Sequence, residues 1–74
     1  MTERERKIAV LLTSIAQGLL TVSQLRRRIA DGKAALPRLA PAQRARTQEA
    51  ISTDEEAVER IEREKVKYDR LKNN

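Results

Sequence analysis

Hydrophobic residues recur every seven positions through the first half of the chain. One heptad position holds five apolar residues: Ile8, Ile15, Val22, Ile29 and Leu36. The companion positions hold Leu11, Gly18, Leu25 and Gly32, with Leu12 and Leu19 one step further round the helix. A seven-residue apolar repeat is typical of a helix that packs along another helix. The pattern therefore predicts one helix over about residues 3–36.

Two prolines mark the end of this helix and the start of the next. Pro37 lacks a backbone N–H and restricts the preceding residue to extended geometry, whereas Pro41 suits the first turn of a helix. We therefore predict a turn over residues 37–40 and a second helix over about residues 41–72. Gly32, after Asp31, is an earlier candidate end for the first helix, but the apolar repeat favours the longer one.

The second predicted helix has a thinner apolar stripe and a densely charged outer face. Its inner positions are Ala50, Ile51, Ala57, Val58, Ile61, Tyr68 and Leu71. The patterns Ser52-x-x-Glu55 and Thr53-x-x-Glu56 resemble capping boxes, which leaves open a helix break near Ser52. Neither proline nor glycine interrupts this segment, so a continuous helix is the favoured interpretation.

Folding the chain about the turn predicts an all-α, antiparallel two-helix hairpin with coiled-coil-like packing. Residues whose numbers sum to about 77 should then lie in one layer. The expected layers are Ile8 with Tyr68, Ile15 with Ile61, Leu19 with Val58, and Leu25 with Ile51. The arms are nearly equal in length, as an antiparallel pair requires.

A charge-free segment, Ile8 to Leu25, is the most unusual feature of a chain in which 36% of residues are charged. One narrow stripe cannot cover so much apolar surface, and exposing it would be unusual for a monomer. We therefore predict a homo-oligomer, such as a helical bundle, or docking onto another protein. The predicted interface residues are Val10, Leu12, Ile15, Gly18, Leu19, Leu20 and Val22. For Gly18, close approach of a neighbouring helix and simple tolerance of a small residue both stay open.

Basic residues concentrate around the predicted turn. The net charge is +5, and the segment from Arg26 to Arg46 contains one acidic residue, Asp31. Its seven cations are Arg26, Arg27, Arg28, Lys33, Arg38, Arg44 and Arg46. We expect them to gather at the hairpin tip and to attract an acidic protein or nucleic acid.

An acidic protein surface is the preferred partner for these cations. Nucleic acid is the alternative, for which small RNA-binding helical hairpin dimers of the Rop type offer an analogy of architecture only. The segment lacks aromatic residues for base stacking, and the chain carries no recognised nucleic-acid-binding motif. Cations at the end of a solvated helix are a simpler explanation for some of these residues.

The composition argues against catalysis and cofactor binding. The chain contains no histidine and no cysteine, so the usual zinc and iron ligand sets are missing and no serine has a histidine to activate it. The acidic residues of the second helix are spaced for ion pairs with Arg and Lys one turn away, which explains them without a metal. We therefore predict a non-enzymatic protein–protein interaction, assembly or regulatory module without a cofactor.

The charge-free segment is also just long enough, as a helix, to cross a thin bilayer. It contains six polar residues, among them Gln17 and Gln24, which disfavour burial in lipid. We therefore expect the protein to lie in the cytoplasm or within a macromolecular assembly rather than in a membrane.

Overall fold

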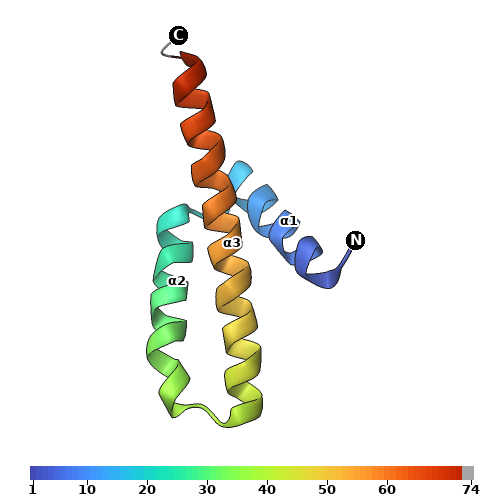
Figure 1. The fold of residues 1–74 in the computed structure, drawn as a ribbon, viewed down its shortest axis with the longest axis vertical. Helices are drawn as coiled ribbons and strands as arrows, with labels where there is room; N and C mark the ends of the chain where they lie inside the picture. The colour runs from blue at the N-terminus through green and yellow to red at the C-terminus, as the bar shows by residue number, and fades with distance from the viewer. Residues whose placement is uncertain (73–74) are drawn as a thin grey trace.

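The fold consists of helices joined by short connections (Figure 1). A computed structural model describes residues 1–72, and describes side chains as far as residue 65. The elements are α1 (Glu3–Ala16), α2 (Val22–Ala35), the 3₁₀ helix η1 (Leu36–Arg38) and α3 (Pro41–Lys72). No strand occurs among the described residues, which confirms the all-α class.

The three α-helices are arranged around the middle of α3. Helix α2 lies beside the first half of α3 and runs in the opposite direction, and η1 and the following turn join the two at one end (Figure 1). Helix α1 crosses α3 at an angle near its middle, and the last part of α3 projects beyond both neighbours (Figure 1). The middle of α3 is therefore the place where all three helices meet.

The prediction of one continuous helix over residues 3–36 is wrong, because the chain turns at Gly18. Its backbone has φ +77°, a left-handed conformation that favours glycine. The amide of Gly18 donates to the carbonyl of Ile15 at 3.1 Å, and the amide of Leu19 donates to that of Ser14 at 2.9 Å. This pair of bonds is the Schellman arrangement that ends many helices. It ends α1 and redirects the chain.

Helix α2 starts with a reciprocal cap at Thr21. The Thr21 hydroxyl accepts from the Gln24 amide at 3.1 Å, and the Thr21 amide donates to the Gln24 side-chain oxygen at 2.8 Å. This capping box satisfies two backbone donors, one of which α2 would otherwise leave without a partner. The break between α1 and α2 is therefore stabilised from both sides by local hydrogen bonds.

The remaining helix boundaries lie close to the predicted ones. Leu36 is an exception, because its backbone is helical (φ −48°, ψ −47°) and it begins η1, although Pro37 was expected to restrict it to extended geometry. Helix α2 continues past Gly32 to Ala35, so the earlier candidate end is not used, and α3 begins at Pro41. Helix α3 also continues through Ser52 without a break. The hydroxyl of Thr53 donates to the carbonyl of Glu49 at 2.8 Å, which is how a threonine is accommodated within a helix.

The core is small and lies where the three helices meet. Ile8, Leu25, Ala57 and Val58 form its buried cluster, and Ile51 is buried elsewhere on α3. Partly buried side chains pack around this cluster: Leu11, Leu12, Ile15, Leu20, Val22 and Ile29. Complete burial of a side chain such as Ile8 or Leu25 contributes about 1.5–3 kcal/mol, so each is a large share of the stability of so short a chain.

The turn at Gly18 also changes how α1 lies against α3. The Arg4 guanidinium pairs with Glu49 at 3.1 Å, whereas Ile15 and Ala16, at the other end of α1, lie beside Ile61. Helix α1 therefore runs in the same general sense as α3. An antiparallel arrangement of residues 3–36 against α3 is excluded, because the turn has already reversed the chain once.

The predicted layers change accordingly. Ile8 belongs to the core with Ala57 and Val58, not to a layer at the far end of α3, and the side chain of Tyr68 lies outside the described residues. Leu25 packs in this cluster instead of beside Ile51. Leu19, predicted to cover Val58, is 75% exposed in the connection. Ile15 and Ile61 do line one groove.

Candidate interaction site

Much of the charge-free segment packs against other parts of the same chain. Of the seven predicted interface residues, four pack against the core: Leu12, Ile15, Leu20 and Val22. Val10 and Leu19 stay exposed, at 64% and 75% of their surface. A Cβ atom on Gly18 would meet nothing within 4 Å, so within the chain this glycine serves the turn and not a close helix contact. The exposed apolar surface is therefore smaller and more local than the sequence suggests.

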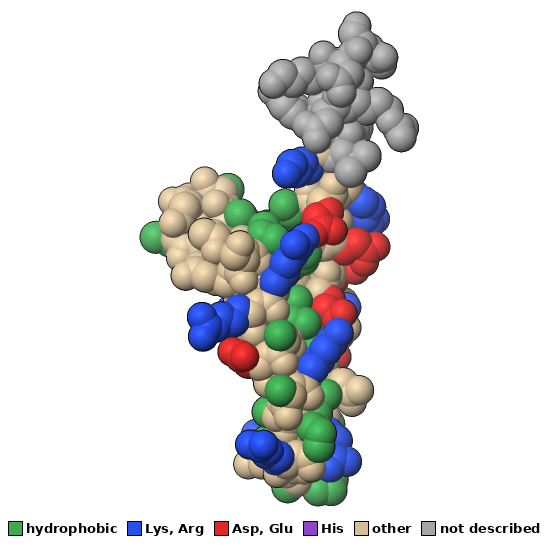
Figure 2. Space-filling model, turned by 90° about the vertical axis from the view of Figure 1, so that its left-hand side faces the viewer, with side chains coloured by type: hydrophobic (Ala, Val, Ile, Leu, Met, Phe, Trp, Pro, Cys, Tyr) green, Lys and Arg blue, Asp and Glu red, His purple; other side chains and the backbone are tan. Residues whose placement is uncertain are grey.

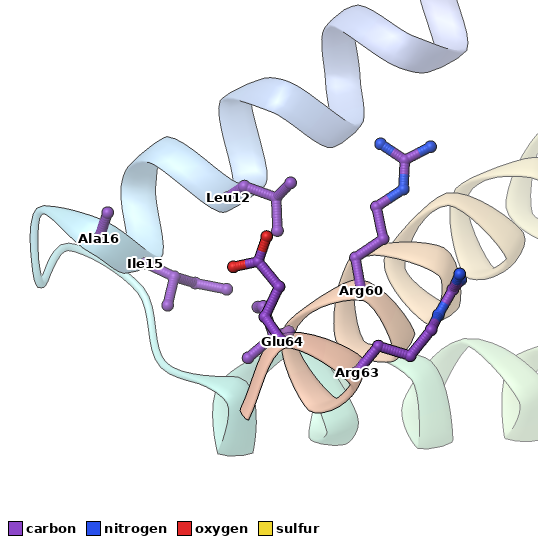
Figure 3. A pocket seen from close by; sticks show the side chains of 7 residues that line it. Leu12, Ile15, Ala16, Arg60, Arg63 and Glu64 are labelled. Carbon is purple, nitrogen blue, oxygen red and sulfur yellow. The ribbon is translucent and has the colours of Figure 1, made fainter. Parts of the chain in front are cut away.

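An open groove of about 720 Å³ lies between the end of α1 and the third quarter of α3 (Figure 3). One wall is apolar and comes from α1, where Leu12 and Ile15 point toward α3 and Ala16 lies beside them (Figure 3). The other wall is formed by Arg60, Ile61, Arg63 and Glu64. We call this space the α1–α3 groove. It combines aliphatic walls with a charged rim, as protein-binding surfaces do.

Ion pairs hold the arginines of this rim along α3. The Arg60 guanidinium pairs with Glu56 at 3.1 Å, and that of Arg63 pairs with Glu59 at 3.1 Å. These are pairs between residues one helical turn apart, which contribute a few tenths of a kcal/mol each. They hold each guanidinium beside an acidic residue of α3.

A second open groove, of about 560 Å³, lies on the other side of α1. Val10 and Leu11 line it from α1, Ala50, Thr53 and Asp54 from α3, and Arg28 from α2. Val10 therefore faces a different groove from Leu12 and Ile15, although all three were predicted to share one interface.

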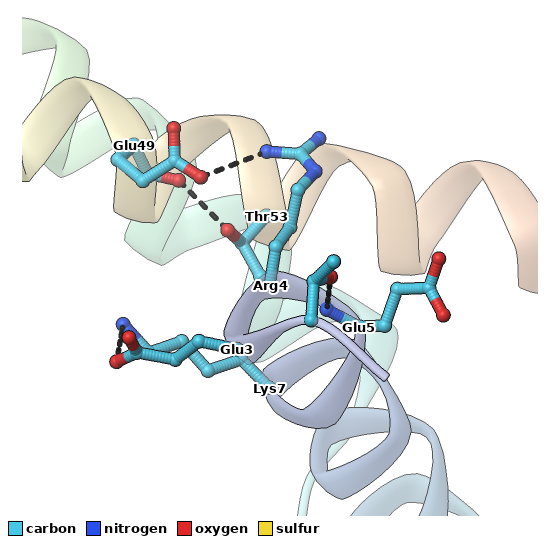
Figure 4. A network of polar contacts seen from close by, with 7 residues as sticks. Glu3, Arg4, Glu5, Lys7, Glu49 and Thr53 are labelled. Atoms are coloured by element: carbon cyan, nitrogen blue, oxygen red, sulfur yellow. Dashed lines mark hydrogen bonds and ion pairs between the residues drawn. The ribbon is translucent and has the colours of Figure 1, made fainter.

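Polar contacts fix the start of α1 near this second groove (Figure 4). Arg4 pairs with Glu49, whose backbone carbonyl accepts from Thr53 (Figure 4). The Thr2 hydroxyl caps α1 by accepting from the amide of Glu5 at 3.2 Å. These bonds orient α1. Among the described residues, every buried polar side-chain atom has a hydrogen-bond partner.

Asp54 is the one buried acidic residue among the described side chains, with 5% of its surface exposed. Burial raises the pKa of its carboxyl group, and the nearby Arg28 guanidinium, 3.4 Å away, partly offsets this effect. The contact joins α2 to α3. With no histidine or cysteine in the chain, Asp54 has no nucleophile–base partner of the usual kind.

The seven predicted cations do not gather at one tip. Arg26 pairs with Glu62, Arg28 with Asp54, and Lys33 with Glu55, so three of the seven tie α2 to α3. Arg26, Arg27 and Arg28 lie in the middle of α2, and the rest of that helix, about 1.5 Å per residue, separates them from the turn. Their expected place at the tip is wrong because about two helical turns lie between them and η1, and because Arg26 and Arg28 pair with acidic residues in the middle of α3.

Four cations do remain at the turn between α2 and α3: Lys33, Arg38, Arg44 and Arg46. Arg44 donates hydrogen bonds to the carbonyls of Leu36 and Leu39, both at 3.2 Å, and these bonds stabilise the turn. Figure 2 shows Lys and Arg side chains at this lower end, with no Asp or Glu side chain on the face in view. We call residues 32–48 the basic tip, because they contain four cations and no acidic residue.

Sequence reasoning missed two structural features, the capping box of α2 and the close helix contact at Gly32. The pattern Thr21-x-x-Gln24 is a capping box and was visible in the sequence as the start of a helix. Gly32, and not Gly18, is the glycine at a close helix contact, since a Cβ atom there would lie 2.9 Å from Cγ1 of Ile51. No sequence signal distinguishes the second case, because closeness depends on which helix lies opposite.

Comparison with known proteins finds no family model, no curated protein and no solved structure that matches this chain. Within residues 1–72, no helix is both long enough and apolar enough to cross a membrane. The side chains that are described include no group of three or more acidic residues placed to hold a metal ion.

Proposed function

We propose that this chain is a non-enzymatic assembly module in which the α1–α3 groove receives Leu19 of a second copy. The observation that carries the proposal is the position of Leu19. It is 75% exposed and follows the apolar wall of the groove by three residues. An exposed leucine beside an apolar groove makes a surface complementary to itself, which is what a two-fold symmetric interface requires.

The exposed area of the chain exceeds that of a compact monomer, in part because the end of α3 projects beyond its neighbours. Its accessible surface is 5999 Å², whereas a compact monomer of its 8.4 kDa mass should expose about 4,600 Å². A standard protein interface covers about 800 Å² on each partner. Covering that much surface by a second copy would bring this chain closer to the usual value, and assembly into a helical bundle is one way to do so.

The energetics indicate that Leu19 cannot act alone. Burying one leucine contributes about 1.5–3 kcal/mol, so two symmetry-related Leu19 side chains contribute about 3–6 kcal/mol. Association costs about 4–15 kcal/mol in lost freedom of motion. The groove walls must therefore also become buried, and Leu12 and Ile15, which are only partly buried within the chain, supply the additional apolar contact.

Sedimentation equilibrium tests this proposal. We expect the wild-type chain to form dimers at high protein concentration and Leu19→Glu to sediment as a folded monomer, because a carboxylate cannot enter the apolar groove. Val10→Glu is the matched control, since Val10 is similarly exposed but faces the second groove. A monomeric wild type would contradict the proposal, and so would dissociation by Val10→Glu but not by Leu19→Glu.

A further inference from the structure

The basic tip is a second exposed surface, and few acidic residues lie near enough to neutralise its positive charge. It holds Lys33, Arg38, Arg44 and Arg46 and no acidic residue, and the first turn of α3 within it is also free of acidic side chains. Lys33 has one weak partner, Glu55, at 3.5 Å. Arg38 and Arg46 form no ion pair with any residue of the described part of the chain. Their guanidinium groups are therefore available to a partner.

The backbone that carries these cations is restricted by two prolines and by hydrogen bonds from Arg44. Pro37 lies in η1 and Pro41 opens α3, and proline restricts the backbone at both positions. Arg44 bridges the two segments by donating to the carbonyls of Leu36 and Leu39. These restrictions reduce the backbone entropy that the turn would lose when a partner binds.

The surface between the cations is apolar and small. Exposed residues of the tip include Pro37, Ala40, Pro41, Ala42 and Ala45. A nucleic-acid backbone offers phosphates and sugars to such a surface, but little that matches its apolar part. The chain contains no aromatic residue before Tyr68 that could stack on bases. Cations interspersed with small apolar residues fit an acidic protein segment better.

We propose that the basic tip docks an acidic segment of another protein, with Arg38 and Arg46 binding its carboxylates. Arginine is suited to this role because its planar guanidinium can bond a carboxylate through two parallel hydrogen bonds. The tip lies at the opposite end of the α2–α3 pair from the α1–α3 groove (Figure 1). The proposal thus goes beyond self-association and leaves both surfaces usable at once.

The test measures binding of a fluorescein-labelled oligoglutamate peptide by fluorescence anisotropy at about 0.15 M ionic strength, where the Debye length is about 8 Å, with a labelled DNA duplex in parallel. We expect the wild type to bind the peptide more tightly than the duplex. The double variant Arg38→Gln/Arg46→Gln should bind the peptide about ten-fold more weakly, because it loses the charge-assisted hydrogen bonds. The matched control is Arg6→Gln/Arg27→Gln, which removes the same charge from two exposed arginines away from the tip.

The control separates a local site from a general effect of net charge. We expect it to change peptide affinity by less than about two-fold, since distant exposed charges are strongly screened. The proposal is overturned if the wild type does not bind the peptide or if both double variants lose the same affinity. Tighter binding to the duplex than to the peptide would also overturn it, in favour of nucleic acid. Leu19→Glu should bind the peptide like the wild type, so failure of the tip and failure of self-association are separate results.

Discussion

Cγ1 of Ile51 on α3 lies 2.9 Å from the position that a Cβ atom on Gly32 of α2 would occupy. Such a separation is shorter than van der Waals contact, so an alanine here would push the two helices apart or displace Ile51. Alanine would gain about 1 kcal/mol of helix propensity, whereas overpacking costs about 1–3 kcal/mol. We predict that Gly32→Ala lowers the free energy of unfolding by about 1 kcal/mol, measured by urea denaturation.

A double-mutant cycle identifies the cause. Ile51→Ala removes the atoms that the new Cβ would meet, so Gly32→Ala should cost less in that background than in the wild type. A stabilising effect of Gly32→Ala alone would show that the helices can separate without loss, and that the close contact contributes nothing.

Gly18→Ala should destabilise the protein for a different reason. Nothing lies within 4 Å of the added Cβ, but the φ of +77° is unfavourable for alanine by about 1–2 kcal/mol. Gly18→Asn should cost less, because asparagine tolerates this conformation better. Circular dichroism should show no added helix in either variant. Increased stability together with increased helix content in Gly18→Ala would indicate one continuous helix through the break.

The cap of α2 can be tested by removing one hydroxyl. Thr21→Ala should lower the free energy of unfolding by about 1 kcal/mol, because the Gln24 amide loses its acceptor. Thr13→Ala is a suitable control, since Thr13 is exposed near the end of α1 and its side chain forms no hydrogen bond within the described residues. Thermal melts of both variants give the comparison. Equal melting temperatures would argue against the capping box.

Asp54 makes stability depend on pH in a direction set by its burial. Because burial raises the pKa of its carboxyl group in the folded protein, folding favours the protonated form. The stability that this group provides is complete below its pKa in the unfolded chain and is lost as the pH rises through its folded-state pKa. Asp54→Asn cannot titrate, so its stability relative to wild type should increase with pH over the acidic range and then level off.

Urea denaturation of both proteins at several pH values measures this difference, in which the other acidic groups cancel. The opposite trend, with wild type gaining on Asp54→Asn as the pH rises, would mean that attraction to Arg28 outweighs burial.

The sequence was sufficient for the helical class and for the boundaries set by local chemistry. Pro41 opens α3 and Pro37 follows the end of α2, as their missing N–H groups require. The uninterrupted path of α3 through Ser52 also follows from the absence of proline and glycine there.

The apolar repeat gave a wrong path for the first half of the chain. Ile8 and Ile15 on α1, and Val22 and Ile29 on α2, keep a spacing of seven residues and all pack in or against the same core. A repeat reports which residues face a partner, not whether the backbone between them is straight. The turn was encoded locally, by Gly18 and by the Thr21–Gln24 capping box, and these signals outweigh the repeat.

The candidate surfaces were also predicted in part wrongly. Val10 and Leu12, two residues apart on α1, face different grooves, and Arg26 and Arg28 pair with acidic residues of α3 instead of gathering at the tip. Such placements depend on contacts between distant segments, which no local pattern contains. Leu19 is left exposed by the turn at Gly18.

Nuclear Overhauser effects between two copies of the chain provide the most direct test of the proposed self-association. In a mixture of isotope-labelled and unlabelled protein, filtered spectra report only contacts between copies. We predict contacts from the Leu19 methyl groups of one copy to the methyl groups of Ile15 and Ile61 in the other. The absence of contacts between copies, or contacts of Leu19 with residues outside the α1–α3 groove only, would contradict the proposal.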